Sequence, residues 1–457
     1  MSFLKKFKMK NLKIDRFFIL IICLILFSRF LLVIFGKNLL GDDGNQYLVR
    51  AESYLKHKIC VFEPNSDPVF HDVPLYPLLL AFILFFTKSM PGLVIKIAGI
   101  LNAIFFTIGA LGVFYFAFKI SRKKTIGYLS MILFSISPES IPYSVFCMPD
   151  SLFLAVFIWS NLYLLNYLYE DKLIYLIISF LLWGLSVLIK PISLFYFIII
   201  SIIVLVLDYR RIFIERVFGV IFGILIGITI IAPWPIRNYF IYNSLTISPK
   251  MDLQLFYYHY YNLLVEITGD KEKAGRVLRQ QETEIKEKYK AIWDNPLMRV
   301  RLLGNWAKKQ IMHELARYLS VSARRHIRLY LGTGTVALLR MFGNERAASA
   351  LEMLEKFPSL SHIQKIPWYA IVIQMVSWIF LLIIYGFVLL GFYNMFRIKN
   401  YPSLIILIAG LFYFIIIIGG TPYTRYRLSI LPFFSILASY SFYGDKIKSK
   451  RNWLIDG

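Results

Sequence analysis

Apolar runs long enough to cross a lipid bilayer dominate this sequence. Residues 17–35 and 93–118 are the two clearest. Further runs lie near 126–146, 151–168, 173–189, 191–207, 217–234, 368–391, 403–420 and 428–443. A helix needs about 20 mainly apolar residues to span the hydrocarbon core, and 58% of the 457 residues are hydrophobic. The sequence therefore predicts an all-α polytopic membrane protein with about ten transmembrane helices.

Basic residues predict how the chain is oriented. Short cytoplasmic segments carry an excess of lysine and arginine, and residues 5–16 are rich in both. We therefore expect a multi-pass protein of the cell membrane, with a cytoplasmic N-terminus and an outer segment after Phe35. Returns at Lys119–Lys124 and Asp208–Arg211 and the tail at 446–451 obey the rule, whereas Glu170–Lys172 does not. Much of the net charge of +24 comes from basic residues in short loops and tails between the predicted spans. Because orientation in the membrane explains this excess, no nucleic-acid partner is expected.

The spacing of the runs predicts three parts. Residues 1–237 form an N-terminal transmembrane core whose first outer loop, residues 36–92, would carry catalytic residues. Residues 238–366 form an extracytoplasmic helical domain, and residues 367–457 a C-terminal transmembrane segment with a basic cytoplasmic tail. The apolar stretch 75–86 is too short to span and is expected at the interface. Outer helices are expected near 253–267, 271–292, 296–319 and 335–356.

Charged residues gather where the predicted spans reach the outer surface. Two adjacent acids, Asp42 and Asp43, follow the first span. The other outer positions are held by Asp150, Lys190, Arg237, Arg425 and Arg427. Any one of these charges can simply stand where water begins, but their convergence predicts a single site assembled from distant parts of the chain.

Each of these residues also has a structural alternative. Asp150 is placed to cap the helix that follows it. Lys190 is placed to snorkel to the interface, and Arg237 to anchor the large outer segment. Arg425 and Arg427 would point the same way on an extended turn and diverge on a helix. We expect one of these two arginines to bind phosphate.

A carboxylate with nearby cations at a membrane surface suits the transfer of a sugar from a lipid phosphate to a hydroxyl group. The phosphate leaving group needs charge neutralisation, and the acceptor hydroxyl needs a base. Asp43 is the candidate base, and Lys190, Arg425 and Arg427 are the candidate cations. Attack from the face opposite the phosphate predicts inversion at the anomeric carbon.

Other classes of membrane protein remain as alternatives. An ion-coupled transporter usually places ionisable groups near the bilayer midplane. The most clearly defined spans have no carboxylate at their centres, and Arg29 is near enough to an outer end to snorkel. Transport is therefore disfavoured. The runner-up is a flippase or transporter for a lipid-linked glycan, followed by a non-catalytic subunit of a membrane assembly.

Five motifs occur in an order typical of one family. They are Asp43 with Tyr47 and Ala51, Pro-Leu-Tyr-Pro-Leu-Leu-Leu at 74–80, Gly-Leu-Ser-Val-Leu-Ile-Lys-Pro at 184–191, Pro-Trp-Pro-Ile-Arg-Asn at 233–238, and Arg-Tyr-Arg-Leu-Ser-Ile-Leu-Pro at 425–432. Together they cover about residues 40–440 and resemble the GT-C glycosyltransferases. The branch most similar contains the protein O-mannosyltransferases and the aminoarabinose and galacturonic acid transferases of lipid A.

This resemblance implies a GT-C fold, a polyprenyl-phosphate-linked sugar donor and catalysis at the extracytoplasmic face. Asp43 matches the first-loop acid that acts as base or orients the acceptor, and Asp42 is its substitute. Asp150 matches an acid that orients donor or acceptor. Lys190 matches a lysine that neutralises the carrier phosphate. Tyr47 belongs to the first motif and is placed with the substrate-binding residues.

Some features depart from the family or stay open. Val73 stands where several lipid A transferases have a lysine, which weakens transfer of their phosphate site and sugar preference, and His71 is a possible substitute. No cofactor is assigned, and a divalent metal is left open without ligands. The acceptor is expected to be an envelope lipid, glycan or protein beside the bilayer. The aromatic stretch 256–261 suits interfacial anchoring, with sugar stacking as the alternative.

Overall fold

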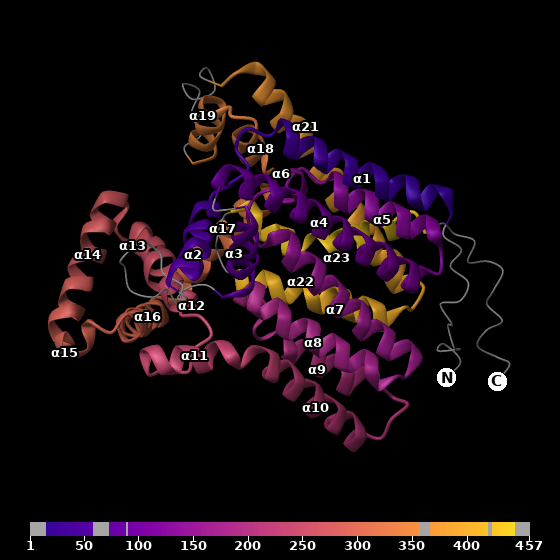
Figure 1. The fold of residues 1–457 in the computed structure, drawn as a ribbon, viewed down its shortest axis with the longest axis horizontal. Helices are drawn as coiled ribbons and strands as arrows, with labels where there is room; N and C mark the ends of the chain where they lie inside the picture. The colour runs from indigo at the N-terminus through magenta and orange to yellow at the C-terminus, as the bar shows by residue number, and fades with distance from the viewer. Residues whose placement is uncertain (1–14, 58–72, 88–89, 357–365, 419–422, 444–457) are drawn as a thin grey trace.

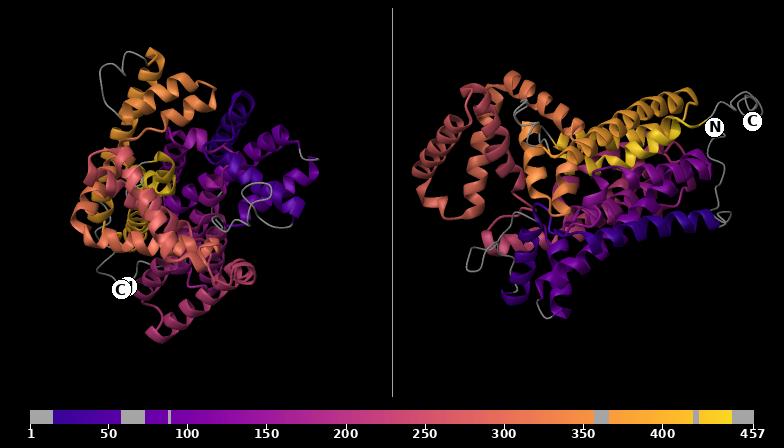
Figure 2. Two further views of the ribbon diagram at one scale, coloured as in Figure 1. Left: turned by 90° about the vertical axis from the view of Figure 1, so that its left-hand side faces the viewer. Right: turned by 90° about the horizontal axis from the view of Figure 1, so that it is seen from above.

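The computed structural model describes residues 15–57, 73–87, 90–356, 366–418 and 423–443. Within these ranges the chain forms helices and turns and no strand. The long helices run side by side as a bundle (Figures 1 and 2). The start of α1 lies at one end of this bundle, and helices α13 to α16 lie beyond the other. The basic residues at 5–13 and 446–451, and His71, fall outside the described residues.

Six helices are long and apolar enough to cross a membrane. They are α1 (Arg16–Phe35), α4 (Pro91–Ser121), α7 (Asp150–Glu170), α10 (Phe213–Ile231), α21 (Trp368–Arg397) and α22 (Tyr401–Ile418). Shorter apolar helices are α3 (Leu75–Phe86), α5 (Lys124–Ile136), α8 (Leu173–Ile189), α9 (Tyr196–Leu207) after the short η2 (Pro191–Ser193), and α23 (Leu431–Tyr440). The all-α, multi-pass class is confirmed. The total of ten spans stays a prediction, because four of the ten are these shorter helices.

Two details of the predicted spans were wrong. The run 126–146 is interrupted, because α5 ends at Ile136 and a separate turn of helix, α6 (Ser140–Tyr143), follows Pro138. A residue that precedes proline disfavours the helical conformation. Glu139, which lies inside this run, is 1% exposed. Arg29 does not snorkel: its guanidinium is buried, donates to the Ser135 carbonyl and stands 5.0 Å from the Phe106 ring.

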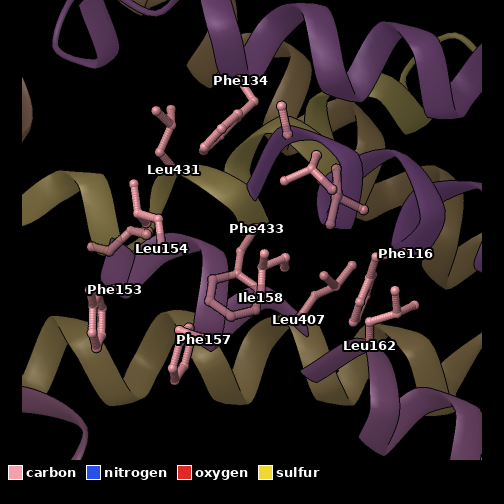
Figure 3. Close-up of a cluster of buried hydrophobic side chains, with 14 of the residues drawn as sticks. Phe116, Phe134, Phe153, Leu154, Phe157, Ile158, Leu162, Leu407, Leu431 and Phe433 are labelled. Carbon is pink, nitrogen blue, oxygen red and sulfur yellow. The ribbon is translucent and has the colours of Figure 1, made fainter. Parts of the chain in front are cut away.

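Helix α7 forms the centre of the bundle. Its Phe153 and Phe157 lie among buried side chains of α4, α5, α22 and α23 (Figure 3), and the Phe157 ring centroid is 5.0 Å from that of Phe414. Between membrane helices, close packing replaces the hydrophobic effect as the stabilising force, and small residues allow the closest approach. Gly109 and Gly112 provide this contact between α4 and α7. The first residue of this central helix is Asp150.

Glycine also fixes the position of α8. A Cβ on Gly184 would lie 2.8 Å from the carbonyl oxygen of Gly227, so α8 and α10 touch backbone to backbone at this point. Gly184 opens the motif that ends in Lys190 and Pro191. The glycine therefore fixes how closely α8 packs against α10. Lys190 is the C-cap of α8.

The outer segment is a succession of helices. They are α11 (Pro233–Tyr242), α12 (Lys250–Gln254), the π-helix η3 (Leu255–Tyr260), α13 (Tyr261–Thr268), α14 (Lys271–Lys288), α15 (Lys290–Trp293), α16 (Pro296–His313), α17 (Leu315–Leu331), α18 (Thr335–Met341) and α19 (Glu345–Lys356). The predicted helix 296–319 breaks at Glu314, and 335–356 breaks at Gly343, whose φ is +77°. Phe256 and Tyr260 of the aromatic stretch pack into the core of this segment, a role that sequence reasoning missed. The domain boundaries remain predictions.

Candidate functional site

Two loops distant in sequence are joined at one end of the bundle. The carbonyl of Leu39 accepts a hydrogen bond from the amide of Cys147 at 2.7 Å. Gly41 adopts φ +69°, and a Cβ there would lie 2.5 Å from the sulfur of Met148. Glycine meets both demands because it lacks a Cβ and tolerates positive φ. This contact holds the loop that bears Asp43 against the loop that leads to Asp150.

Asn102, on α4, holds the loop that leads to Asp150. Its side-chain amide is fully buried and donates to the carbonyl oxygens of Phe146 and Met148, the latter at 3.1 Å, and to the Tyr76 hydroxyl at 3.0 Å. Tyr76 is the tyrosine of the Pro-Leu-Tyr-Pro motif. Buried amides with several partners hold one conformation because an unmade hydrogen bond is costly. Through the contact between Tyr76 and Asn102, the Pro-Leu-Tyr-Pro motif helps to hold the loop that leads to Asp150.

Arg425 links the two loops through its side chain. It lies on the 3₁₀ helix η4 (Thr424–Ser429). Its Nε and Nη2 donate to Asp150 Oδ2 at 3.0 and 2.9 Å, and its Nη1 pairs with Asp43 Oδ2. On the far side of Asp150, Lys190 Nζ contacts Oδ1 at 2.6 Å. We call Asp43, Arg425, Asp150 and Lys190 the Arg425 cluster.

These pairings decide between the alternatives for Asp150 and Lys190. Asp150 does not cap its own helix: the N-cap position of α7 belongs to Pro149 and is made without a side-chain hydrogen bond. Lys190 does not snorkel, because its side chain is 12% exposed and turned to Asp150. Lys250, the first residue of α12, lies close enough to interact electrostatically with Lys190. It adds positive charge that sequence reasoning missed.

Exposure differs sharply within the Arg425 cluster. The side chain of Asp150 is 1% exposed and that of Arg425 is 9%, whereas that of Asp43 is 36%. Burial alone would lower the pKa of Arg425, but Asp150, Tyr47 and Asp43 outweigh it and raise that pKa above its ordinary value. Asp43 is therefore the carboxylate of this cluster that a substrate can reach most easily.

Arg427 belongs to a different cluster. Its Nε pairs with Glu139 Oε1 at 2.9 Å, and both side chains are 1% exposed. Its Nη1 donates to the carbonyls of Leu329, Tyr330 and Gly332 at 3.2, 2.9 and 2.7 Å. We call Arg427 and Glu139, with these carbonyls, the Arg427 cluster. The two arginines diverge because η4 is helical, as the sequence predicted for a helix.

Asp42 and Tyr47 lie beside the Arg425 cluster. Asp42 Oδ1 is 3.5 Å from Arg340 Nη1, and its side chain is half exposed. Desolvation raises the pKa of the Asp42 carboxyl, and the charge of Arg340 opposes this shift. Tyr47 is buried on α2 (Gly44–His57) with its ring 5.5 Å from that of Tyr76. Its hydroxyl interacts electrostatically with Arg425 and contributes to the raised pKa of that guanidinium.

Arg237 lies apart, with local partners. Its Nη1 donates to Asn238 Oδ1 at 2.7 Å, and its guanidinium stands 4.7 Å from the Trp234 ring. Asn238 in turn donates to the Thr246 carbonyl at 2.7 Å. These contacts fit the alternative in which Arg237 anchors the outer segment.

Tyr143 is a further residue that sequence reasoning missed. It is buried on α6, and its hydroxyl interacts electrostatically with Asp42, Arg425 and Asp150. Burial raises the pKa of Tyr143, and Asp42 adds to that shift. A tyrosine within an apolar run gives no sequence signal of a functional role, so only the folded structure shows that Tyr143 lies at the site.

The described residues contain no group of three or more His, Cys, Asp or Glu side chains able to hold a metal ion.

Residues 72–236 match the sequence model of the dolichyl-phosphate-mannose-protein mannosyltransferase family. The resemblance to GT-C glycosyltransferases is confirmed. The match includes Asp150 and Lys190, and folding adds Asp43 and Arg425 from outside the matched range. The match spans 165 of the 457 residues, about a third of the chain.

Solved structures show a distant likeness. The archaeal oligosaccharyltransferase AglB from Archaeoglobus fulgidus, in complex with an inhibitory peptide and a dolichol-phosphate, is 13% identical with a TM-score of 0.49. That match covers 93% of this chain and 50% of the other, so the chain spans about half the length of AglB. ArnT from Cupriavidus metallidurans, bound to undecaprenyl phosphate, is 12% identical with a TM-score of 0.41, covering 94% and 78%. No curated protein sequence matches the chain significantly.

Proposed function

We propose that this protein transfers a monosaccharide from a polyprenyl phosphate to an acceptor hydroxyl at the outer face of the cytoplasmic membrane. The observation that carries the proposal is the Arg425 cluster. It combines one accessible carboxylate, Asp43, with a buried acid and two cations. A family whose name includes a dolichyl-phosphate sugar matches the part of the chain that contributes Asp150 and Lys190.

The cations suit the leaving group. When the bond between the anomeric carbon and the phosphate oxygen breaks, the electron pair stays on the phosphate, whose negative charge then increases. Lys190 and Arg425 are placed to stabilise that charge, with Lys250 nearby. Asp150 holds both cations in place, and preorganised charges of this kind need no reorganisation during the reaction. Asp150 is thus a positioning residue in this proposal.

Asp43 suits the role of the base. It takes the proton from the acceptor hydroxyl while that oxygen bonds to the anomeric carbon on the face opposite the phosphate, which inverts the configuration. In the resting site, Asp43 is paired with Arg425. An incoming phosphate competes for the same guanidinium. Donor binding would therefore release Asp43 for the acceptor.

An apolar pocket near Lys190 supports a lipid-linked donor. It has a volume of about 290 Å³ and is lined by apolar side chains of α8, α9, α10 and α11, among them Trp183, Ile228 and Pro235. Trp183 donates to the Ser193 carbonyl at 2.8 Å, and the Ser193 hydroxyl donates to the Lys190 carbonyl at 3.3 Å. The pocket wall thus connects directly to the turn that carries a proposed phosphate ligand, as an amphipathic phosphate ester requires.

Sugar transfer by membranes tests the proposal. Membranes with matched levels of wild-type protein, Asp43→Asn or Asp42→Asn receive radiolabelled polyprenyl-phosphate sugars. Loss of a general base typically costs about 10²–10⁴-fold in rate, so we expect that loss for Asp43→Asn and near-normal transfer for Asp42→Asn. Full transfer by Asp43→Asn would remove the base assignment. Absence of transfer even by wild type would favour the flippase alternative. The anomeric configuration of the product, read by NMR, tests inversion.

A further inference from the structure

We propose that the cleft between η3–α13 and α14 binds a carbohydrate chain. This inference rests on the proposed function and deepens it, because a carbohydrate chain held on the outer segment is one class of acceptor for that reaction. Helices α13 and α14 pack side by side in the outer segment (Figure 1), and the cleft between them has a volume of about 590 Å³. That volume falls within the range of about 300–1,000 Å³ typical of ligand sites. The lining residues are Tyr257, Tyr261, Lys271, Glu272, Gly275, Arg276, Leu278, Arg279 and Glu282.

The first observation is the π-helix that carries Tyr257 and leads directly into Tyr261, the first residue of α13. Residues 255–260 form a π-helix, a rare conformation that occurs frequently at functional sites. Tyr257 and Tyr261 both line the cleft, and their hydroxyls donate to Glu282 Oε1 at 2.8 Å and to the Lys271 carbonyl at 3.3 Å. Both rings are thereby tied to α14. A ligand would meet aromatic surfaces already held in place, which reduces the entropy lost on binding.

The second observation is Gly275, the fifth residue of α14. Glycine is disfavoured in a helix interior relative to alanine. A Cβ on Gly275 would have no atom within 4 Å, so packing does not explain the glycine. Gly275 lines the cleft. The glycine at position 275, which helix propensity disfavours, is therefore explained by the space that it leaves for a ligand.

The chemistry of the lining indicates a sugar chain. The negative face of a tyrosine ring attracts the weakly positive C–H groups on the apolar face of a sugar ring. The three basic and two acidic side chains of the lining offer donors and acceptors to hydroxyl groups. Arg276 and Glu272, 3.9 Å apart and largely exposed, form a weak pair that can open toward a ligand. The excess of one positive charge favours a glycan that contains uronic acids.

Calorimetry on the full chain in lipid nanodiscs tests the proposal. The probes are a galacturonic acid hexasaccharide, neutral chitohexaose and a serine- and threonine-containing hexapeptide, each added without donor. We expect wild type to bind the acidic hexasaccharide most tightly. Gly275→Ala should raise the thermal midpoint, because alanine favours the helix, and yet weaken binding on the order of tenfold, because its methyl group would occupy space in the cleft. Gly386→Ala, at another helical glycine whose Cβ would meet open space, is the matched control.

The outcomes separate this proposal from the function on which it rests. A gain in stability with a loss of binding in Gly275→Ala supports the cleft, because a purely structural glycine would not produce both. Failure of wild type to bind either saccharide, unchanged binding by Gly275→Ala, or tighter binding of the peptide would overturn it. Saccharide binding by a wild-type protein that transfers no sugar would overturn the proposed function and leave the carbohydrate site.

Discussion

Arg425 and Arg427 lie on η4 with one residue between them, and their surroundings differ sharply. Arg427 is enclosed by Glu139 and three backbone carbonyls, with both charged side chains 1% exposed. Arg425 is shared between a buried acid and Asp43, which is 36% exposed. A buried pair whose partners are all protein groups holds two parts of the chain together. A pair with one accessible partner can exchange that partner for a ligand.

The difference has a physical basis in desolvation. Removing one member of a buried ion pair leaves the other charged and unpaired, which costs about 3–5 kcal/mol. The Arg425–Asp43 pair is partly exposed and screened by water, so it contributes far less. The Arg425–Asp150 pair is buried, but Asp150 keeps a second cation, Lys190, when Arg425 is changed. We therefore expect changes in the Arg427 cluster to affect stability, and changes in the Arg425 cluster to affect sugar transfer. Substitutions in each cluster, together with the transfer test of Asp43→Asn, can separate an effect on stability from an effect on transfer.

The largest effect on stability is expected for Glu139→Ala. The substitution leaves Arg427 buried without its carboxylate, so the free energy of unfolding should fall by about 3–5 kcal/mol. Thermal unfolding in detergent measures the change. Glu352→Ala, which removes a half-buried partner of Arg340, is the control and should cost about 1 kcal/mol or less. Equal losses in the two variants would break the comparison.

A smaller effect is expected for Gly41→Ala, which disturbs the Arg425 cluster without removing a charge. The new Cβ would meet Met148, and the left-handed backbone adds strain, so stability should fall by roughly 1–2 kcal/mol. Because the loop bearing Asp43 must shift, transfer should fall more than the folded fraction does. Gly269→Ala has a similar φ, +68°, but open space around its Cβ. If this control loses transfer to the same degree, contact with Met148 does not position Asp43.

A further effect is a pH dependence that belongs to the outer helices and not to either cluster. Burial, with Arg325 and His326, lowers the pKa of His259 to about 4, and its Nδ1 is 2.9 Å from the Tyr318 hydroxyl. The unfolded chain takes up this proton near pH 6.5, whereas the folded chain does so only near pH 4. Stability should therefore fall as pH drops through this window, by at most about 1.4 kcal/mol per pH unit.

Thermal midpoints between pH 7 and 5 measure this dependence. His259→Gln should flatten it while sugar transfer is retained. An unchanged slope in the variant would assign the acid sensitivity to other groups.

Sequence reasoning predicted the Arg425 cluster better than the Arg427 cluster. Asp43, Asp150, Lys190 and Arg425 each stand near an end of an apolar run, where a charge is conspicuous. The ordered motifs contain Asp43, Lys190 and Arg425. Glu139 lies inside an apolar run that looked like a single span, and its partner is distant in the sequence. Local patterns do not reveal which buried charges pair, because pairing depends on how helices pack.

The same limit applies to the fold. The apolar runs predicted the all-helical membrane class, because a bilayer leaves few other ways to satisfy the backbone. The break after Ile136 and the π-helix at 255–260 were not predicted. The break has a local cause, Pro138, which the length of the apolar run concealed. The π-helix depends on tertiary contacts, because it packs Phe256 and Tyr260 into the outer core.

The most direct test of this division is a paired measurement on Arg425→Lys and Arg427→Lys. Both variants keep the positive charge and lose the guanidinium that contacts several partners at once. For each, the rate of sugar transfer and the thermal midpoint are measured in the same preparation. We expect Arg425→Lys to lose most of its transfer at a nearly wild-type midpoint, and Arg427→Lys to lower the midpoint while its folded fraction still transfers sugar. The reverse result, or equal changes in both quantities for the two variants, would contradict the division between the two clusters.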